Sequence, residues 1–565
     1  MVNLADTADL WWKNAVLYCA DVQTFLDLDG DGNGDLRGML HRVDYLADLG
    51  VTCLWLMPFY PTGGSDDGYD ITDFYGVDPQ LGSAGDLVEL VRTCHSRGIR
   101  VVVDFVMNHT SERHPWWKQA LRGEDDPRRD WYVWRSSTPP DTSKQVVFPD
   151  KEDSIWEQDP ASGQWYLHHF YKTQPDLNLA NPAVRDEVMR TMGYWLELGI
   201  DGFRIDAVPF LFTEDQVPKK ERRFPPFDPH DYLRNLKAHA GRRNGTVMFL
   251  GEVNLPYPDM AAFFGSGDAD ELSMQFDFIG MQAFYLSLAR GDVRPLTTAL
   301  RERPAIDVGS QWANFLRNHD ELTLDKLSAD ERQEVFDAFG PDPEHQLFDR
   351  GLRRRLPPML GGDQRRIRMA YSLMFSLPGT PVLFYGEEIG MGENLDVPGR
   401  LAVRTPMQWQ PGDHGGFSTA GRRSLVRPVT RGAYGADQVN VAAQRSDPDS
   451  LWSFVRRIIS RYRQSPEIGW STVEVFDHGD DRVLAHVCRK DEWALLALHN
   501  FADEPVEVSL EVPGLTRGTR LVDLLTPGPS EELETGPRGR FTCTLSAYDH
   551  RWLRVVLDDD RRIDH

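Results

Sequence analysis

The feature that most constrains the fold is an alternation between short apolar runs and longer stretches with helical spacing, which begins near residue 15. Runs rich in β-branched and aromatic residues predict strands, and their alternation with helices is typical of βαβ units. There are eight such runs, namely AVLYCADV, VTCLWLMP, RVVVDFV, GFRIDAV, VMFLGEV, SMQFDF, QWANFL and PVLFYG. Eight strands favour an α/β fold in which a parallel sheet closes into a (β/α)8 TIM barrel.

Helix signals lie between these runs. Ser83 and Asp86 have the spacing of a capping box, which predicts a helix start at residue 83. Asn181 and Pro182 combine an N-cap residue with a proline at the first helical position, which predicts another. Apolar residues recur at helical spacing over residues 36–47, so we expect a helix between the first two strands.

Three segments depart from the alternation. The first is rich in Trp, Pro, Asp and Ser and predicts a small irregular domain inserted into the barrel. The second is a charged helical insertion near residues 323–365. The third contains short alternating strands such as VLAHVCR and WALLALHN, which are typical of an antiparallel β-sandwich. The expected division is the first part of the barrel (1–109), the inserted domain (110–181), the rest of the barrel (182–465) and a C-terminal β-sandwich (466–565).

Charge and cysteine content narrow the partners and the compartment. A formal charge of -25 disfavours nucleic acid and anionic membrane, because like charges repel. The N-terminal MVNLADTADLWWKN lacks the basic and apolar regions of a signal peptide, and no segment reaches 18 apolar residues. The five cysteines are scattered without CxxC spacing, which indicates neither a disulfide framework nor a zinc site. We therefore expect a cytoplasmic protein.

Charged and polar side chains follow several of the predicted strands. In a barrel, the carboxyl ends of the strands meet at one rim, where reactive residues lie. The residues at that rim are Asp104, Asn108, His109, Arg204, Asp206, Glu252, Asn318, His319 and Asp320. Gathering such charge is costly unless it serves a function.

Paired carboxylates at one rim are what cleavage of a glycosidic bond requires. One attacks the anomeric carbon and the other protonates the leaving oxygen, at a separation of about 5 Å in retaining enzymes. Neighbouring strands can supply Asp206 and Glu252 at such a distance. Arg204, two residues before Asp206, would keep that carboxylate ionised, while a more apolar setting would keep its partner protonated.

These blocks resemble the four signature regions of the α-amylase family, glycoside hydrolase family 13, and the resemblance covers nearly the whole chain. It implies Asp206 as nucleophile, Glu252 as general acid and base, and Asp320 as the carboxylate that grips the sugar hydroxyls. It also implies that Arg204, His109 and His319 line the same subsite. The inserted segment, with Gln174-Pro-Asp176-Leu-Asn178, is similar to domain B of that family.

A second stretch, Asp66-Asp67-Gly68-Tyr69-Asp70, resembles the part of the family in which a tyrosine stacks under the first glucose. By that resemblance Asp66 pairs with Arg404 and closes one end of the pocket. A closed end selects one non-reducing glucose unit, so the expected substrate is a small α-linked disaccharide rather than starch.

Within the family, FLRNHDELTLD and RTPMQW resemble the trehalose synthase subgroup, which implies interconversion of maltose and trehalose without an organic cofactor. Departures lie at Thr213-Glu214-Asp215, where a loop of that subgroup is missing, and at Glu252-Val253-Asn254, where the subgroup has Glu-Ala-Asn. An α-glucosidase or transglucosidase that hydrolyses maltose, sucrose or trehalose therefore stays an alternative. A non-catalytic barrel is disfavoured by the intact set of carboxylates. Members of the subgroup often associate, which implies a homo-oligomer.

The acidic stretch DLDGDGNGD suggests a metal site. Its oxygen-bearing side chains alternate as in a calcium loop, at Asp27, Asp29, Asp31, Asn33 and Asp35. Position 12 is Gly38 instead of the glutamate of an EF-hand, and a strand precedes the loop, so a calcium sensor is excluded. The loop resembles the structural Ca2+ (or Mg2+) site that family members carry after the first strand.

The subgroup also implies a second calcium site between the barrel and the inserted domain. Asn108 and Asp176 match two of its side-chain ligands, and the carbonyls of Phe210 and Leu211 would supply others. Thr213 stands where that site has a glutamate.

Overall fold

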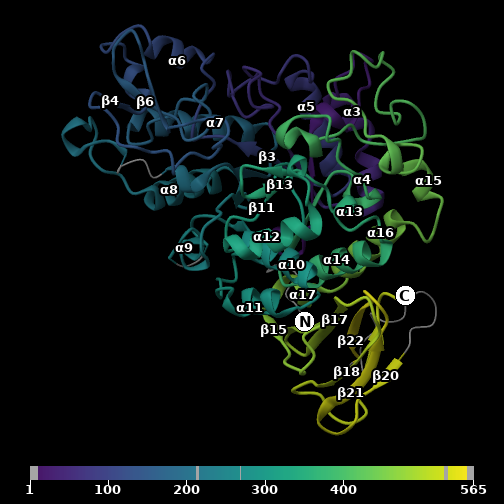
Figure 1. Ribbon diagram of the computed structural model, residues 1–565. Helices are drawn as coiled ribbons and strands as arrows, with labels where there is room; N and C mark the ends of the chain where they lie inside the picture. Colours follow the sequence, from purple (N-terminus) through teal and green to yellow (C-terminus); the bar gives the residue numbers. More distant parts are fainter. Residues whose placement is uncertain (1–9, 212–215, 267–268, 527–531, 557–565) are drawn as a thin grey trace.

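The core of the protein is a closed barrel of eight parallel strands (Figure 1). The computed structural model describes residues 10–211, 216–266, 269–526 and 532–556. Around the barrel the order is β1, β14, β10, β9, β8, β7, β3 and β2. Their bounds are β1 (Leu17–Ala20), β2 (Cys53–Leu56), β3 (Arg100–Phe105), β7 (Gly202–Ile205), β8 (Met248–Gly251), β9 (Met274–Phe276), β10 (Gln311–Asn314) and β14 (Thr380–Phe384). Seven of the eight predicted runs contain one of these strands and the eighth, PVLFYG, overlaps all of β14 except Thr380, so the barrel prediction is confirmed.

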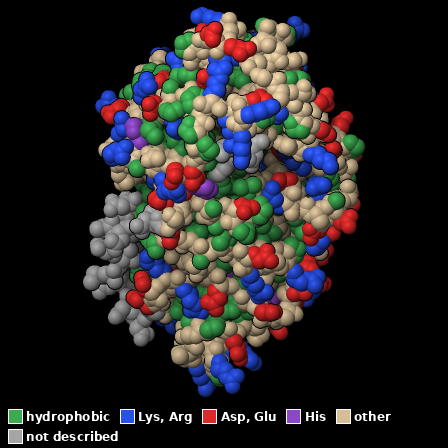
Figure 2. All heavy atoms as spheres, turned by 90° about the vertical axis from the view of Figure 1, so that its left-hand side faces the viewer, with side chains coloured by type: hydrophobic (Ala, Val, Ile, Leu, Met, Phe, Trp, Pro, Cys, Tyr) green, Lys and Arg blue, Asp and Glu red, His purple; other side chains and the backbone are tan. Residues whose placement is uncertain are grey.

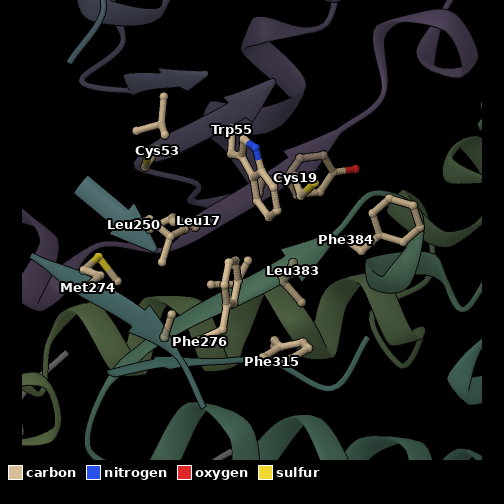
Figure 3. Packing of buried hydrophobic residues seen from close by; sticks show 14 of the residues in the cluster. Leu17, Cys19, Cys53, Trp55, Leu250, Met274, Phe276, Phe315, Leu383 and Phe384 are labelled. Carbon is tan, nitrogen blue, oxygen red and sulfur yellow. The ribbon is translucent and has the colours of Figure 1, made fainter. Parts of the chain in front are cut away.

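Both faces of this sheet are buried, which explains why its strands read as nearly continuous apolar runs. Inside the barrel, the ring of Trp55 lies 5.7 Å from that of Phe276, and Phe276 lies 5.3 Å from Phe315 (Figure 3). Such aromatic contacts add to the free energy gained by burying apolar area. The packed interior fixes the strands and therefore the residues that follow them.

The predicted helix starts are confirmed. The helix α5 (Ala84–Ser96) begins with the full capping box of Ser83 and Asp86, and α7 (Pro182–Glu197) begins after Asn181, whose side chain accepts a hydrogen bond from the next turn. The helix expected over residues 36–47 is two helices, α3 (Leu36–His41) and α4 (Val43–Leu49). They meet at Arg42, whose backbone leaves the helical region.

The inserted segment after β3 folds as a small unit with its own sheet, at the side of the barrel labelled α6, β4 and β6 (Figure 1). It contains α6 (Pro115–Ala120) and three antiparallel strands, β4 (Trp134–Arg135), β5 (Trp156–Gln158) and β6 (Trp165–Leu167). Buried Val133, Ile155, Trp156 and Leu167 form its separate apolar core. On this side of the molecule, acidic and basic side chains are interspersed over the surface (Figure 2).

The insertion near residues 323–365 is only partly helical. Besides α12 (Ala329–Phe339) and α13 (Leu356–Met359), it contains a small sheet of β11 (Leu322–Thr323), β12 (Gln346–Leu347) and β13 (Gly351–Leu352). Strands of two residues are too short to leave a periodic pattern, which is why the sequence predicted helix alone.

The C-terminal part is the expected antiparallel sandwich. One sheet has β15 (Val473–Val475), β16 (Val483–Lys490), β17 (Trp493–Asn500), β22 (His550–Val555), β19 (Arg520–Asp523) and β20 (Glu532–Glu534) in that order, and the other has β18 (Val506–Glu511) and β21 (Arg540–Leu545). It docks on the barrel through α14 (Gln364–Ser376), whose Ser372 hydroxyl accepts a hydrogen bond from Trp552 at 3.0 Å. Among the described residues, no helix is both long and apolar enough to cross a membrane.

Candidate active site

A cavity of about 410 Å³ contains most of the residues expected at the rim. Its wall includes five of these rim residues, together with Asp66 and Tyr69 of the second stretch; the five are His109, Asp206, Glu252, Asn318 and Asp320. They come from loops that follow different barrel strands, because the closed sheet brings all its carboxyl ends to one side.

One guanidinium group holds the two carboxylates expected to carry the chemistry. Arg204, at the end of β7, forms an ion pair through Nη1 with Asp206 and through Nη2 with Glu252, the latter at 2.9 Å. Its Nη1 also donates to Asp104 Oδ1 at 2.7 Å. Arg204 and Asp206 lie on one face of the strand, as the period of two predicted. Both carboxylates therefore face the same cavity.

The two carboxylates differ in acidity in the order that acid–base work on a glycoside requires. Burial raises the pKa of Asp206 to about 6, although Arg204 opposes the shift. Burial and the charges of Asp206 and Asp320 raise the pKa of Glu252 to about 7. Glu252 is thus the group that keeps its proton at higher pH. Its environment is not the apolar one expected from the sequence, because it touches Arg204 and accepts a hydrogen bond from the Ala207 N–H at 3.2 Å.

Asp320 has the opposite environment. Its Oδ1 accepts hydrogen bonds from Arg400 at 2.7 Å and from Arg404 at 3.0 Å, and its Oδ2 lies 3.1 Å from His319 Nε2. Burial opposes ionisation, but His319 and the two arginines hold the pKa of Asp320 well below its usual range. This carboxylate is therefore charged throughout the range in which Asp206 and Glu252 titrate.

The pairing expected between Asp66 and Arg404 is wrong, and Arg400 takes that place. Arg400 Nη2 binds Asp66 at 2.6 Å, and the same guanidinium binds Asp320 and lies 4.9 Å from the ring of Phe148. Arg404 is turned away because its Nη1 binds Asp67 at 2.5 Å and its Nε donates to the His319 carbonyl at 2.8 Å. The end of the cavity is closed by an ion pair, but by a different arginine.

Three residues expected to line the subsite lie behind its wall instead. Arg204, His319 and Arg404 are almost fully buried and are not among the residues that line the cavity. His319 acts through Tyr69, since Tyr69 Oη lies 2.7 Å from His319 Nε2 and the two rings are stacked within 7° of parallel. Burial lowers the pKa of His319 to about 4, so its ring is neutral at neutral pH.

Other residues of the wall were not singled out from the sequence. They include Phe148, Phe170, Asn254, Glu321, Asp325 and Arg400. Asn254 donates to Asp325 Oδ1 at 2.9 Å and so joins the loops after β8 and β10. Two of these wall residues could have been found from the sequence: Asn254 lies two residues after Glu252, and Arg400 lies four residues before Arg404. Nothing in the sequence near Phe148 or Phe170 marked them as wall residues.

A contact between the inserted domain and the hairpin of β12 and β13 forms part of the cavity wall, which Val147, Phe148 and Arg350 line. Arg350 Nη1 donates to the Val147 carbonyl at 2.7 Å, and its Nη2 binds Glu321 at 3.0 Å. Beside this bond the ring of Phe148 lies 5.0 Å from that of Phe348. The two segments are 203 residues apart in the chain where Arg350 and Val147 meet. This contact, called the roof below, consists of Val147, Phe148, Phe348 and Arg350.

The acidic loop after β1 has the donors of a cation site. Ligand oxygens of Asp27, Asp29 and Asp35 lie within 4.8 Å of one another. The side-chain oxygen of Asn33 is buried and has no hydrogen-bond partner among the described residues. Asp31 lies outside this group of oxygens, and its Oδ1 accepts a hydrogen bond from the Asn33 N–H at 2.7 Å. Clustered carboxylates with an unpartnered carbonyl oxygen fit a hard divalent cation.

The donors expected for a second metal do not fit one. Asn108 Nδ2 donates to the Phe210 carbonyl at 3.2 Å, so two of the expected ligands bind each other. Both carboxylate oxygens of Asp176 accept hydrogen bonds from His169, one from its N–H and one at Nδ1. Leu211 is described, whereas Thr213 lies outside the described residues, as do Glu214 and Asp215.

Comparison with known proteins agrees with this geometry. The α-amylase catalytic domain family matches residues 22–336 and 353–469, and the sucrose hydrolase-like C-terminal domain family matches residues 494–554. The trehalose synthase/amylase TreS of Mycobacterium tuberculosis (strain H37Rv) is 39% identical over 90% of this chain and 85% of its own length. The trehalose synthase of Pimelobacter sp. (strain R48) is 36% identical over 97% of this chain and 96% of its own length.

Among solved structures, the trehalulose synthase MutB superposes with a TM-score of 0.76 at 26% identity and covers 97% of this chain and 100% of its own. The family match spans well over half of the chain and includes every carboxylate of the cavity. The chain therefore belongs to the α-amylase family of glycoside hydrolases, family 13.

Proposed function

We propose that this protein is a retaining glucosyl-transferring enzyme that interconverts maltose and trehalose. The observation that carries the proposal is a cavity with paired carboxylates on Arg204, closed at one end by Arg400 and lined in part by the roof. A cavity of about 410 Å³ suits a disaccharide better than a polymer. Relatives named trehalose synthase at 36–39% identity support the same activity.

In the proposed reaction, Asp206 attacks the anomeric carbon of the non-reducing glucosyl unit while Glu252 gives its proton to the glycosidic oxygen. This leaves a covalent glucosyl–enzyme and free glucose in the cavity. The glucose turns, Glu252 takes the proton of its anomeric hydroxyl, and that oxygen attacks the glucosyl carbon and releases Asp206. One C–O bond breaks and one forms at each step, so neither water nor a redox partner is consumed.

Asp320 and the closed end would hold the glucosyl unit during both steps. A carboxylate that is ionised at all relevant pH values can accept hydrogen bonds from two sugar hydroxyls and stabilise the positive charge that develops at the ring. The pKa of Asp320, held low by His319, Arg400 and Arg404, supports this role. Tyr69, stacked on His319, would form the platform under the sugar ring.

Hydrolysis by the same carboxylates is the weaker alternative. A hydrolase needs water at the anomeric carbon after the first step, whereas an isomerase must retain the glucose and exclude water. The roof favours retention, because it ties the inserted domain to the segment after β10 at the wall of the cavity.

A divalent cation, Ca2+ or Mg2+, is part of the proposal for the acidic loop. Asp27, Asp29 and Asp35 with Asn33 would hold it. Bound there, the cation would neutralise the carboxylates and stabilise the loop. We do not propose a second metal at Asn108 and Asp176, because, unlike Asn33 in the acidic loop, neither has a buried oxygen without a hydrogen-bond partner among the described residues. Cytoplasmic location and assembly into a homo-oligomer stay predictions.

Product analysis tests the function directly. The protein is incubated with maltose, and trehalose and glucose are quantified separately over time. We expect trehalose to be the main product and glucose a minor one. Glucose as the dominant product, without trehalose, would replace this proposal with the α-glucosidase alternative. Asp206→Ala should abolish both products while the circular dichroism spectrum is unchanged.

A further inference from the structure

The ion pairs of the closed end continue beyond the wall of the cavity. Asp67 binds Arg404 Nη1 at 2.5 Å through one carboxylate oxygen and binds Arg427 Nη2 through the other. Arg427 Nη1 in turn binds Asp21 Oδ2 at 2.9 Å. Carboxylates and guanidinium groups thus alternate from Asp320 inward, each held by the next. None of these side chains is more than 17% exposed.

Arg427 contacts Arg404 in two ways. Its Nη1 donates to the Arg404 main-chain carbonyl at 3.0 Å, and its Nη2 binds the carboxylate that the Arg404 side chain also binds. Arg427 is only 5% exposed, and no part of it lines the active-site cavity. It therefore fixes both the backbone and the side-chain partner of the arginine that reaches Asp320.

The charge on Asp67 explains why this second arginine matters. Arg404 serves two carboxylates, Asp67 and Asp320, with one positive charge. While Arg427 shares Asp67, that carboxylate is balanced without the full charge of Arg404. Without Arg427, Asp67 would stay buried with Arg404 as its sole cation within ion-pair distance among the described residues. Arg404 would then be drawn toward Asp67 and away from Asp320.

We propose that Arg427 is a positioning residue that holds the sugar-binding carboxylate Asp320 in place, acting through Asp67 and Arg404. The inference rests on the proposed function only in assigning Asp320 to the sugar. Its consequence is specific: loss of Arg427 weakens binding of the glucosyl unit, and removal of the charge on Asp67 restores it.

Four variants test this relay, each measured by initial rates on p-nitrophenyl α-glucoside and by calorimetric binding of the glucose analogue 1-deoxynojirimycin. Arg427→Met should raise KM and the Kd of the analogue about tenfold, with a smaller change in kcat. A tenfold loss of affinity equals about 1.4 kcal/mol. Arg427→Lys keeps the charge, so its KM and Kd should lie between those of the unaltered protein and those of Arg427→Met. Asp67→Asn alone should stay within about threefold of the unaltered protein, because a neutral Asp67 frees Arg404 for Asp320.

The double variant Arg427→Met with Asp67→Asn gives the decisive readout. If Arg427 acts by balancing Asp67, the double variant regains most of the affinity lost in Arg427→Met. If Arg427 merely supports the fold, the two losses add. Additive losses, or an unchanged KM in Arg427→Met, would overturn the inference. Because Asp21 also loses its cation in the double variant, a triple variant that adds Asp21→Asn keeps the test informative if Arg427→Met does not fold.

A matched control comes from another buried ion pair. Arg554 of β22 binds Glu467 at 3.1 Å, at the junction of the sandwich with the barrel. Arg554→Met should lower the Tm without changing KM. An equal rise of KM in Arg554→Met would mean that any destabilised variant loses affinity, which would refute the relay. If the unaltered protein neither turns over the glucoside nor binds the analogue, the proposed function fails as well, an outcome distinct from failure of Arg427 alone.

Discussion

The roof makes a quantitative prediction about the balance between transfer and hydrolysis. Arg350 donates one hydrogen bond to the Val147 carbonyl and two to Glu321 Oε1, from Nε at 3.3 Å and from Nη2 at 3.0 Å, and its side chain is 24% exposed. A charged hydrogen bond contributes about 1.5–3 kcal/mol when buried, and we take about 1 kcal/mol at this partly exposed position. Arg350→Met would then increase the population of states with an open roof about fivefold.

An open roof admits water to the glucosyl–enzyme and lets glucose leave. If hydrolysis follows the population of open states, the fraction of maltose converted to glucose should rise about fivefold in Arg350→Met, while the rate of the first step changes little. Separate quantification of trehalose and glucose from one time course gives this ratio. The pre-steady-state burst of p-nitrophenol from p-nitrophenyl α-glucoside reports the first step alone.

A neighbouring arginine provides the control. Arg353 directly follows the same hairpin, but it donates to the carbonyls of Glu344 and Val397 and, among the described residues, makes no bond to the inserted domain. Arg353→Met should leave the ratio of glucose to trehalose unchanged. The reasoning is refuted if Arg350→Met also leaves the ratio unchanged, or if both variants shift it equally.

Three further predictions follow from the site. The first concerns pH: Asp206 must be ionised and Glu252 protonated, and their pKa values are about 6 and about 7. The value of kcat/KM should therefore peak between pH 6 and 7 and fall on both sides. A profile that stays flat to pH 9 would contradict the assignment of Glu252 as the acid. Arg400→Met removes the closed end, so we expect KM for maltose to rise at least tenfold, with longer maltooligosaccharides becoming substrates; an unchanged KM would reject the closing role. Ca2+ at a hundred times its Kd should stabilise the fold by about 2.7 kcal/mol and raise the Tm, and Asp27→Asn should abolish this rise. Equal Tm values with Ca2+ and with EDTA would exclude the loop as a metal site.

The sequence by itself determined the elements of the barrel and the identity of its strand-end residues. Strands and helices each have a characteristic spacing of apolar residues along consecutive positions. The eight strand runs, the capping box at Ser83 and the helix start after Asn181 could therefore be recognised from local sequence. Closure of the sheet then required that Asp206, Glu252 and Asp320 meet at one rim, because parallel strands share an edge.

Only the tertiary structure decided how the charged groups pair. Arg400 and Arg404 are four residues apart, and either could have bound Asp66; the choice depends on which carboxylates of distant loops reach each guanidinium. Likewise, nothing near Asp176 in the sequence showed that His169 would occupy both of its oxygens. The arginine partners of Asp66 and Asp67 are 334 and 337 residues away in the chain, so packing rather than any local pattern fixes these pairs.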